Sequence, residues 1–238
     1  MEVKFVKGFT LAEVLVTIGI IGIVAAMTLP TVITNYQKKQ TVIQLKKVYS
    51  ILNQAIELSE TANENVKYWN FEQSSADFFN MYLRPYINTI NSTTRGKTSS
   101  IKYTRPNKKP ASGITTFNYS NTEIVSLEDG TTFYLPKTST QNQYKSINVD
   151  INGYKKPNRI GRDYFCFSIL KDYGLVPYGY KKSSMMGTIF IGFDTFDRET
   201  IKNNGVYGCS YNDVTGAGMY CAALIITDNW EIRNDYPW

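Results

Sequence analysis

One carboxylate stands out among the residues that could do chemistry in this chain. Glu13 is the only charged residue in the apolar run from Phe9 to Leu29, which reads FTLAEVLVTIGIIGIVAAMTL. An ionisable side chain at the middle of a membrane helix costs on the order of 2.5–3.5 kcal/mol, so it is usually functional and paired. We therefore expect Glu13 to meet a positive partner. The alternative is a glutamate near the membrane end that reaches back to water.

The rest of the composition offers little for catalysis. The 238 residues include no histidine, which excludes Ser-His-Asp and Cys-His nucleophilic catalysis and zinc sites with imidazole ligands. The sequence also has no P-loop or dinucleotide-binding motif. Carboxylate or lysine chemistry is left as an alternative, in which the chain is a membrane-anchored or secreted enzyme. We expect no enzymatic activity, no cofactor and no catalytic residue.

The apolar run has the length of a membrane helix and follows a short leader. At roughly 1.5 Å per residue it forms a helix of about 30 Å, enough to cross a bilayer core. The leader, MEVKFVKG, ends in Gly8, whereas an ordinary secretory signal has its cleavage site after the apolar region. Val24-Ala25-Ala26 offers such an ordinary site, which would give a secreted protein starting at Met27. Glu13 inside the apolar region argues against that alternative.

The stretch GFTLAEVL resembles the type III signal of type IV prepilins and pseudopilins. In that family a membrane-embedded aspartic peptidase cuts after the glycine on the cytoplasmic side and N-methylates the new terminal phenylalanine. The resemblance implies that Gly8 and Phe9 flank the cut. It also implies that Glu13 pairs with the terminal amine of a neighbouring subunit in the filament. Gly22 and Pro30 fall where many members of that family carry a helix-loosening glycine and a kinking proline.

The same resemblance implies a location and a set of partners. The expected location is the cytoplasmic (inner) membrane, crossed once with the head outside the cytoplasm, and then a pilus or pseudopilus filament. The expected partners are other pilin or pseudopilin subunits, the prepilin peptidase, an inner-membrane assembly platform and the cytoplasmic membrane. The basic residues do not orient the helix by themselves, because lysines flank the apolar run on both sides. The orientation rests on the signal.

A second helical pattern follows Pro30. Apolar residues at Val42, Leu45, Val48 and Leu52 recur in steps of three and four, which predicts one buried face of an amphipathic helix. The resemblance implies an α+β fold, the pilin-like lollipop, in which a long N-terminal helix packs on a small antiparallel β-sheet head. The expected divisions are a cleaved leader (1–8), a transmembrane and assembly helix (9–30), an amphipathic helix continuing into the head (31–60) and a globular head (61–238).

Several elements of the head are predicted from local patterns. Asp129-Gly130 is a hairpin turn signal between the strand patterns Glu123–Leu127 and Thr131–Leu135. Ser74 or Ser75 is the cap candidate for a short helix that reaches Ile87. Further strands are expected at Tyr144–Ile151, Asp163–Leu170 and Thr188–Phe193, and a short helix across MYCAALII. The terminal sequence Tyr236-Pro237-Trp238 is too apolar for a free tail, so we expect it to dock on the head.

The chain has three cysteines, at positions 166, 209 and 221. Bacterial pilins often cross-link their C-terminal region with a disulfide, and the resemblance therefore implies a Cys209–Cys221 bridge. Such a bridge contributes roughly 3 kcal/mol in the loop-entropy model. Cys166 lies between two phenylalanines in a strand pattern, where a small buried thiol is expected.

The stretch DINGYKKPNRIGRD contains oxygen ligands that resemble a calcium loop. They are Asp150, Asn152, Asn158 and Asp163, and some major pseudopilins bind calcium in a loop of the head. An EF-hand-type loop needs more oxygen ligands at set spacing. The stretch is also crowded with lysine and arginine. Asx and glycine turns that join two strands are the favoured interpretation, with no metal ion.

The most polar stretch, Asn88 to Gly113, leaves a binding function open. It contains the basic residues Arg95, Lys97, Lys102, Arg105, Lys108 and Lys109 around Tyr103. Basic residues with an aromatic can bind single-stranded nucleic acid, although a solvated mobile loop is the simpler interpretation. The sequence thus predicts a structural filament subunit that performs no chemistry. The alternative is a DNA- or surface-binding minor pilin or adhesin.

Overall fold

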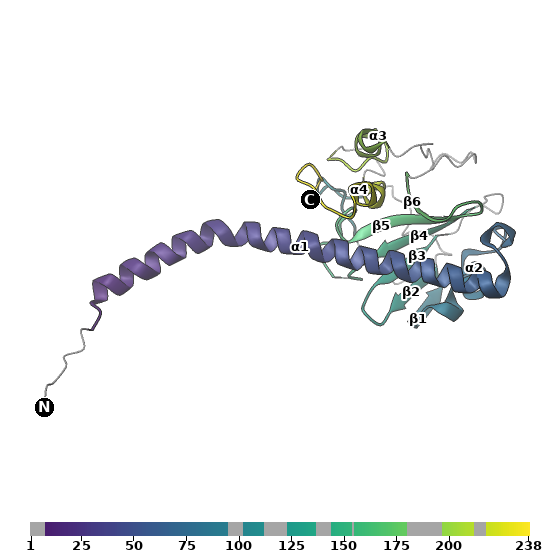
Figure 1. Cartoon of the computed structure of the whole chain (residues 1–238), viewed down its shortest axis with the longest axis horizontal. Coiled ribbons are helices and arrows are strands. Elements are labelled where there is room, and N and C mark those ends of the chain that lie inside the picture. Colours follow the sequence, from purple (N-terminus) through teal and green to yellow (C-terminus); the bar gives the residue numbers. More distant parts are fainter. Residues whose placement is uncertain are drawn as a thin grey trace, which may run out of the picture. The chain divides into compact units, whose positions relative to one another are not determined.

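The computed structural model describes residues 8–94, 102–111, 123–136, 144–153, 155–179, 197–211 and 218–238. Two compact units make up the chain, Met1–Gln40 and Thr41–Trp238. Helix α1, Leu11–Asn63, is continuous over 53 residues and contributes to both units (Figure 1).

The first unit consists of the exposed part of α1. Its helix runs through Pro30 without a break. Proline has no N–H group, so it makes no hydrogen bond to the carbonyl of Ala26, one turn earlier. The hydroxyl groups of Thr28 and Thr34 donate to the carbonyl oxygens of Val24 at 2.9 Å and Pro30 at 2.8 Å. The two hydroxyl groups thus give carbonyl oxygens of the helix a side-chain hydrogen-bond donor close to the proline.

In the second unit α1 buries one face. Leu45, Val48 and Leu52 are each at most 1% exposed, which confirms the amphipathic pattern expected from the sequence. The buried stripe continues to Ser59, and the helix ends at Asn63. Tyr49 packs on Phe167 of the sheet with ring centroids 5.9 Å apart. The apolar stripe of α1 thus forms part of the head core.

The head is built on a six-stranded antiparallel sheet in the order β1-β2-β3-β4-β5-β6, so strands that follow each other in the chain are neighbours. The strands are β1 Thr89–Thr94, β2 Glu123–Leu127, β3 Thr132–Leu135, β4 Tyr144–Asp150, β5 Tyr164–Leu170 and β6 Gly174–Pro177. Strands β3, β4 and β5 are buried along their whole length, so both of their faces are covered. The expected α+β fold with a long N-terminal helix and an antiparallel sheet is confirmed.

Short helices complete the head. They are η1 Val66–Tyr68, α2 Ser75–Tyr82, η2 Arg84–Tyr86, α3 Arg198–Asn203 and α4 Cys221–Thr227. Ser74 caps α2 by accepting the N–H of Asp77, as expected for a serine before an apolar-periodic run. Pro85 lies in η2 after the end of α2. The short helix expected across MYCAALII is confirmed as α4.

The hairpin turn at Asp129-Gly130 is confirmed, and it is packed against the β4–β5 turn. Gly130 has φ +90°, which favours glycine. Gly153 has φ +67°, and a Cβ placed there would lie 2.5 Å from the carbonyl oxygen of Gly130. Only glycine allows the two turns to approach this closely, so they lie together at one end of the sheet.

Three elements differ from the sequence expectation. The polar stretch from Asn88 was expected to be a loop, but it contains β1, whose sequence TINSTT lacks alternating apolar residues because β1 is an edge strand. Strand β6 and helix α3 were not predicted, since β6 has four residues and α3 buries only Ile201. The strand expected at Thr188–Phe193 lies outside the described residues.

The C-terminal segment is fastened to the head by covalent and polar contacts. The Cys209–Cys221 disulfide is present, and Cys166 is a buried free thiol, as expected. The Tyr236 hydroxyl donates to the carbonyl oxygen of Gly161, and Tyr236 is 3% exposed. The expected docking of the C-terminal residues is therefore confirmed.

An ion network joins α3 to the same segment. Arg198 donates to both carboxylate oxygens of Asp228, at 2.6 and 2.9 Å, and Asp228 is 1% exposed. Arg198 also pairs with Asp235, which accepts from Lys202 at 2.8 Å. The hydrogen bonds from Arg198 and Lys202 hold the pKa of Asp235 well below its usual range. The network ties together residues that are about thirty positions apart in the chain.

We expect the double substitution Cys209→Ser and Cys221→Ser to lower the free energy of unfolding by about 3 kcal/mol, because the bridge closes a loop across a separation of 12 residues. Urea denaturation of the full chain in detergent measures the change. Reduction of the wild-type chain should have the same effect and serves as the control. Equal midpoints for the oxidised, reduced and doubly substituted chains would contradict a stabilising role for the bridge.

Candidate functional site

The N-terminal end of α1 is organised by two side chains, Thr10 and Glu13. The backbone N–H and the hydroxyl of Thr10 both donate to Oε2 of Glu13, at 2.8 and 2.7 Å, and the N–H of Glu13 donates to the Thr10 hydroxyl at 3.2 Å. This reciprocal arrangement is a capping box, which satisfies N–H groups that a helix leaves unpaired at its start. Glu13 therefore has a local structural role.

Glu13 has a second carboxylate oxygen that the capping box does not use. Every hydrogen bond to its side chain among the described residues ends on Oε2. Oε1 is left exposed to the surroundings of the helix. One carboxylate can thus cap its own helix and still accept a hydrogen bond or an ion pair from outside the chain.

The apolar residues around this end are uncovered. Phe9 is 87% exposed, and the large apolar side chains between it and Pro30 are at least 44% exposed. They are Leu11, Val14, Leu15, Val16, Ile18, Ile20, Ile21, Ile23, Val24, Met27 and Leu29. Among the described residues, α1 is the one helix long and apolar enough to cross a membrane, a test that signal sequences also pass. An uncovered apolar surface of this extent needs a bilayer or another chain to cover it.

Two glycines interrupt this apolar surface. A Cβ placed on Gly19 or on Gly22 would meet no atom within 4 Å. Contacts within the chain therefore do not require glycine at either position. Small residues on membrane helices let the backbone of a second helix approach closely, so the two glycines mark a face on which another helix can pack.

The residues that resemble a calcium loop come together in the turn between β4 and β5. Asp163 accepts the backbone N–H groups of Asn158 at 2.7 Å and Arg159 at 2.5 Å, and the side-chain amide of Asn152 lies 3.5 Å from it. Asp150 accepts the N–H of Asn152 at 3.1 Å. Both carboxylates therefore close turns, as the Asx-turn interpretation predicts.

Burial perturbs the acid–base properties of this turn. Asp150 is fully buried and Asp163 is 2% exposed. Burial raises the pKa of Asp150 to about 7 and the pKa of Asp163 to about 6. The hydroxyl of Tyr103 donates to Asp150, and burial raises the pKa of Tyr103 as well. No group of three His, Cys, Asp or Glu side chains in the described part of the chain is placed to hold a metal ion.

The structure separates the basic residues that the sequence grouped together. Lys102, Lys108 and Lys109 are exposed, whereas Arg105 is 8% exposed. Arg95 and Lys97 lie outside the described residues. The expectation of a solvated mobile loop is wrong for 102–111, because Tyr103 is 4% exposed and backbone hydrogen bonds join the loop to the β4–β5 turn. Arg105 is therefore not part of the surface on which the three lysines are exposed.

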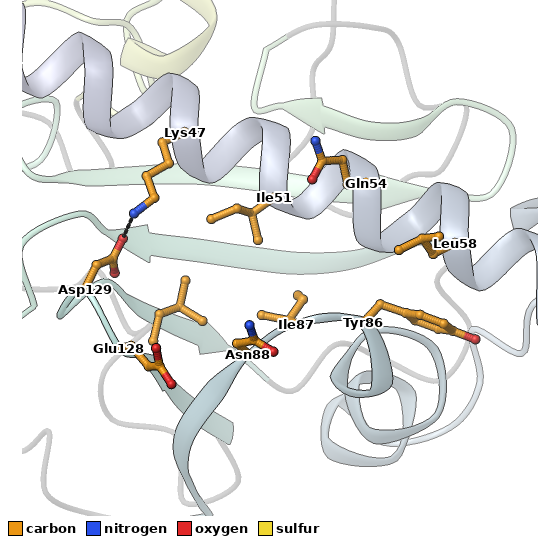
Figure 2. Close-up of a pocket in the computed structure, with 10 residues that line it drawn as sticks. Lys47, Ile51, Gln54, Leu58, Tyr86, Ile87, Asn88, Glu128 and Asp129 are labelled. Carbon is orange, nitrogen blue, oxygen red and sulfur yellow. Dashed lines mark hydrogen bonds and ion pairs between the residues drawn. The ribbon is translucent and has the colours of Figure 1, made fainter.

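A groove lies beside the exposed flank of α1 in the head (Figure 2). Its volume is about 550 Å³, and it lies between α1, the segment before β1 and the β2–β3 turn. The Lys47 ammonium pairs with Asp129 at 2.7 Å across one side of it. The other lining residues are Ile51, Gln54, Leu58, Tyr86, Ile87, Asn88, Leu127 and Glu128. Nothing in this mixture of apolar and polar side chains arranges a nucleophile with a base.

Sequence reasoning missed two features of these sites. The capping box was detectable, because Thr-x-x-Glu before an apolar run is its signature. The packing of loop 102–111 on the β4–β5 turn left no local signal, because the hydrogen bonds between Thr104, Asn158 and Ile160 join segments about fifty residues apart. Such contacts depend on the sheet order.

The turn carboxylates predict a pH dependence of stability. A pKa raised in the folded state means that the folded protein binds the proton more tightly than the unfolded chain, whose aspartates titrate near 3.9. The contribution is present below about pH 4 and is lost as the pH rises through 6 to 7. We expect the head to lose on the order of 3 kcal/mol of unfolding free energy between pH 5 and pH 8.

Urea denaturation across this pH range measures the effect. Asp150→Asn keeps an acceptor for Tyr103 and should flatten the profile above pH 5. Glu72→Gln removes an exposed carboxylate of the head and should leave the profile unchanged. A wild-type profile that rises from pH 5 to pH 8 would contradict the assignment.

Comparison with known proteins matches both parts of the chain. Residues 4–29 match the prokaryotic N-terminal methylation motif, and residues 31–238 match a family of unknown function, DUF6613. Neither the curated proteins nor the solved structures include a match. The methylation motif covers Gly8, Phe9 and Glu13, so the resemblance to a prepilin-type signal is confirmed. The N-terminal segment of the chain carries a type IV prepilin-type signal, and through residues 31–238 the chain belongs to the DUF6613 family.

Proposed function

We propose that this chain is a structural subunit, pilin-like or pseudopilin, of a type IV pilus or type II secretion-type filament. A prepilin peptidase cuts between Gly8 and Phe9 and methylates Phe9. The observation that carries the proposal is the match to the methylation motif on a helix whose apolar surface is uncovered and contains one carboxylate, Glu13.

Cleavage prepares the charge pair that assembly needs. It frees the α-amine of Phe9, which is positive at neutral pH and lies one helical turn before Glu13. When helices from several subunits pack together, the Glu13 carboxylate of an incoming subunit pairs with the terminal amine of a neighbour. In a low-dielectric filament core a charge without its partner is strongly unfavourable, so the pair sets the axial register between subunits.

The capping box is compatible with pairing between Glu13 and the terminal amine of a neighbouring subunit. Oε2 of Glu13 accepts both hydrogen bonds from Thr10, so Oε1 is available to accept an ion pair from another subunit. Gly19 and Gly22, which have open space around them, allow close approach of a neighbouring helix. Pro30 removes one backbone hydrogen bond and gives the helix a place to bend as it leaves the membrane for the filament.

The head supplies the surface of the filament and takes no part in chemistry. Its core is closed by the disulfide and by the Arg198 network. Before assembly the apolar helix anchors the subunit in the cytoplasmic membrane, with the head outside the cytoplasm, where disulfides persist. An inner-membrane platform then moves the subunit into the filament.

Two substitutions separate the charge of Glu13 from its capping role. Glu13→Gln preserves the capping box, because glutamine serves at that position, but it removes the charge. We expect normal membrane insertion and a reduction of about a hundredfold or more in the amount of subunit recovered in sheared filaments, since breaking a buried ion pair costs 3–5 kcal/mol. Quantitative immunoblots of the membrane and filament fractions from the native host measure this.

Thr10→Ala is the matched control. It removes the cap at a cost of about 1 kcal/mol in helix stability and keeps the carboxylate, so the variant should still assemble. The reverse pattern, in which Glu13→Gln assembles normally and Thr10→Ala does not, would show that Glu13 only caps the helix.

A further inference from the structure

Two loops of the head that are distant in sequence are joined by backbone hydrogen bonds. The N–H of Thr104 donates to the carbonyl oxygen of Asn158, and the N–H of Ile160 donates to the carbonyl oxygen of Thr104, both at 2.9 Å. Loop 102–111 is thereby fixed against the turn between β4 and β5. Lysines of the two loops are brought to the same end of the sheet.

Five exposed lysines lie on these loops: Lys102, Lys108, Lys109, Lys155 and Lys156. We call them the lysine surface. No ion pair joins Lys102, Lys108, Lys155 or Lys156 to a residue that the structure describes. The lysine surface therefore carries a concentrated positive charge.

The neighbouring acidic groups do not neutralise this charge. Asp150 and Asp163 are buried under the loops and accept hydrogen bonds from within the turn. On the adjacent β2–β3 turn, Asp129 is paired with Lys47, which leaves Glu128 as an exposed carboxylate. Among the residues that the structure describes, exposed lysines outnumber exposed carboxylates at this end of the sheet.

The lysine surface lies at the end of the head where α1 enters it. The hydroxyl of Thr41 donates to the carbonyl oxygen of Arg162, in the same β4–β5 turn, at 3.3 Å. Thr41 follows the last residue of the apolar run, Leu29, by about a dozen residues, or roughly 18 Å along a helix. The stretch of chain that connects the apolar run to the β4–β5 turn is therefore short.

We propose that the lysine surface docks the head on anionic lipid headgroups of the membrane that its own helix spans. Each lysine near an anionic membrane surface adds about 1 kcal/mol, equivalent to roughly fivefold, and the attraction decays over a Debye length of about 8–10 Å. The tether supplies the local concentration that makes such modest attraction sufficient. Docking holds the unassembled subunit at the membrane and is released when the helix is withdrawn into a filament.

The side chains of these loops suit a lipid surface better than single-stranded nucleic acid. Nucleic-acid surfaces of this type combine cations with aromatic rings on which bases stack. Tyr103, the aromatic residue in the basic stretch, is 4% exposed and donates its hydroxyl to Asp150. Arg162 is also occupied, because its guanidinium lies 4.6 Å from the centre of the Trp238 ring.

Hydrogen exchange of the full chain in nanodiscs tests the proposal. Amides of loops 102–111 and 155–162 should exchange more slowly in discs enriched in phosphatidylglycerol than in phosphatidylcholine discs, and high salt should remove the difference. The double variant Lys155→Gln, Lys156→Gln should lower the ratio of docked to free heads by about thirtyfold. These loops would then exchange at the same rate in both kinds of disc.

The control variant removes the same charge from the other end of the sheet. Lys67, in η1, and Lys171, which follows β5, are far from the β4–β5 turn, so Lys67→Gln, Lys171→Gln should dock like the wild type. Equal loss of docking in both variants would mean that only net charge matters and would overturn the assignment to the lysine surface.

Two other results would also overturn it. One is identical wild-type exchange in the two kinds of disc, and the other is protection of these loops by an added oligonucleotide with no effect of phosphatidylglycerol. The proposal rests on membrane anchoring and not on filament assembly. A chain that is cleaved and assembled but does not dock refutes only the lipid contact, and a chain that docks but is never cleaved refutes only the proposed function.

Discussion

The rest of the structure depends on one constraint: the chain buries the apolar side chains of only the second part of helix α1. From Leu45 onward the apolar stripe of α1 is buried in the head, whereas from Phe9 to Leu29 every large apolar side chain is exposed. The hydrophobic effect makes the first part a core element and leaves the second part in need of a bilayer or of other helices. The proposed membrane anchoring and the proposed assembly both rest on this division of α1.

Two turns that pack together organise one end of the sheet in the head. The two turns at Gly130 and Gly153 pack against each other, and the buried carboxylates of Asp150 and Asp163 close the β4–β5 turn from inside. Inward-facing acids leave the neighbouring lysines as the exposed charge. The polar residues that resemble a calcium loop thus hold a turn together and shape the surface above it.

The sequence was most informative where a pattern is local. The apolar period of α1, the Asp129-Gly130 turn, the Ser74 cap and the strand at DYFCFSIL all depend on neighbouring residues, and the structure confirms them. Edge strand β1 and the burial of Tyr103 and Arg105 could not be predicted, because they depend on partners far away in the chain. The pairing role of Glu13 with a terminal amine stays a prediction from its sequence context, and its capping partner Thr10 was overlooked.

The most direct test of the central claim is the N-terminal sequence and intact mass of the protein purified from membranes of its native host. The account predicts a mature chain that starts at Phe9 and carries one methyl group on its α-amine. A chain that starts at Met27 would contradict it, because Glu13 would then be removed before assembly. An uncut chain would contradict it as well, since no terminal amine would be present one helical turn from Glu13.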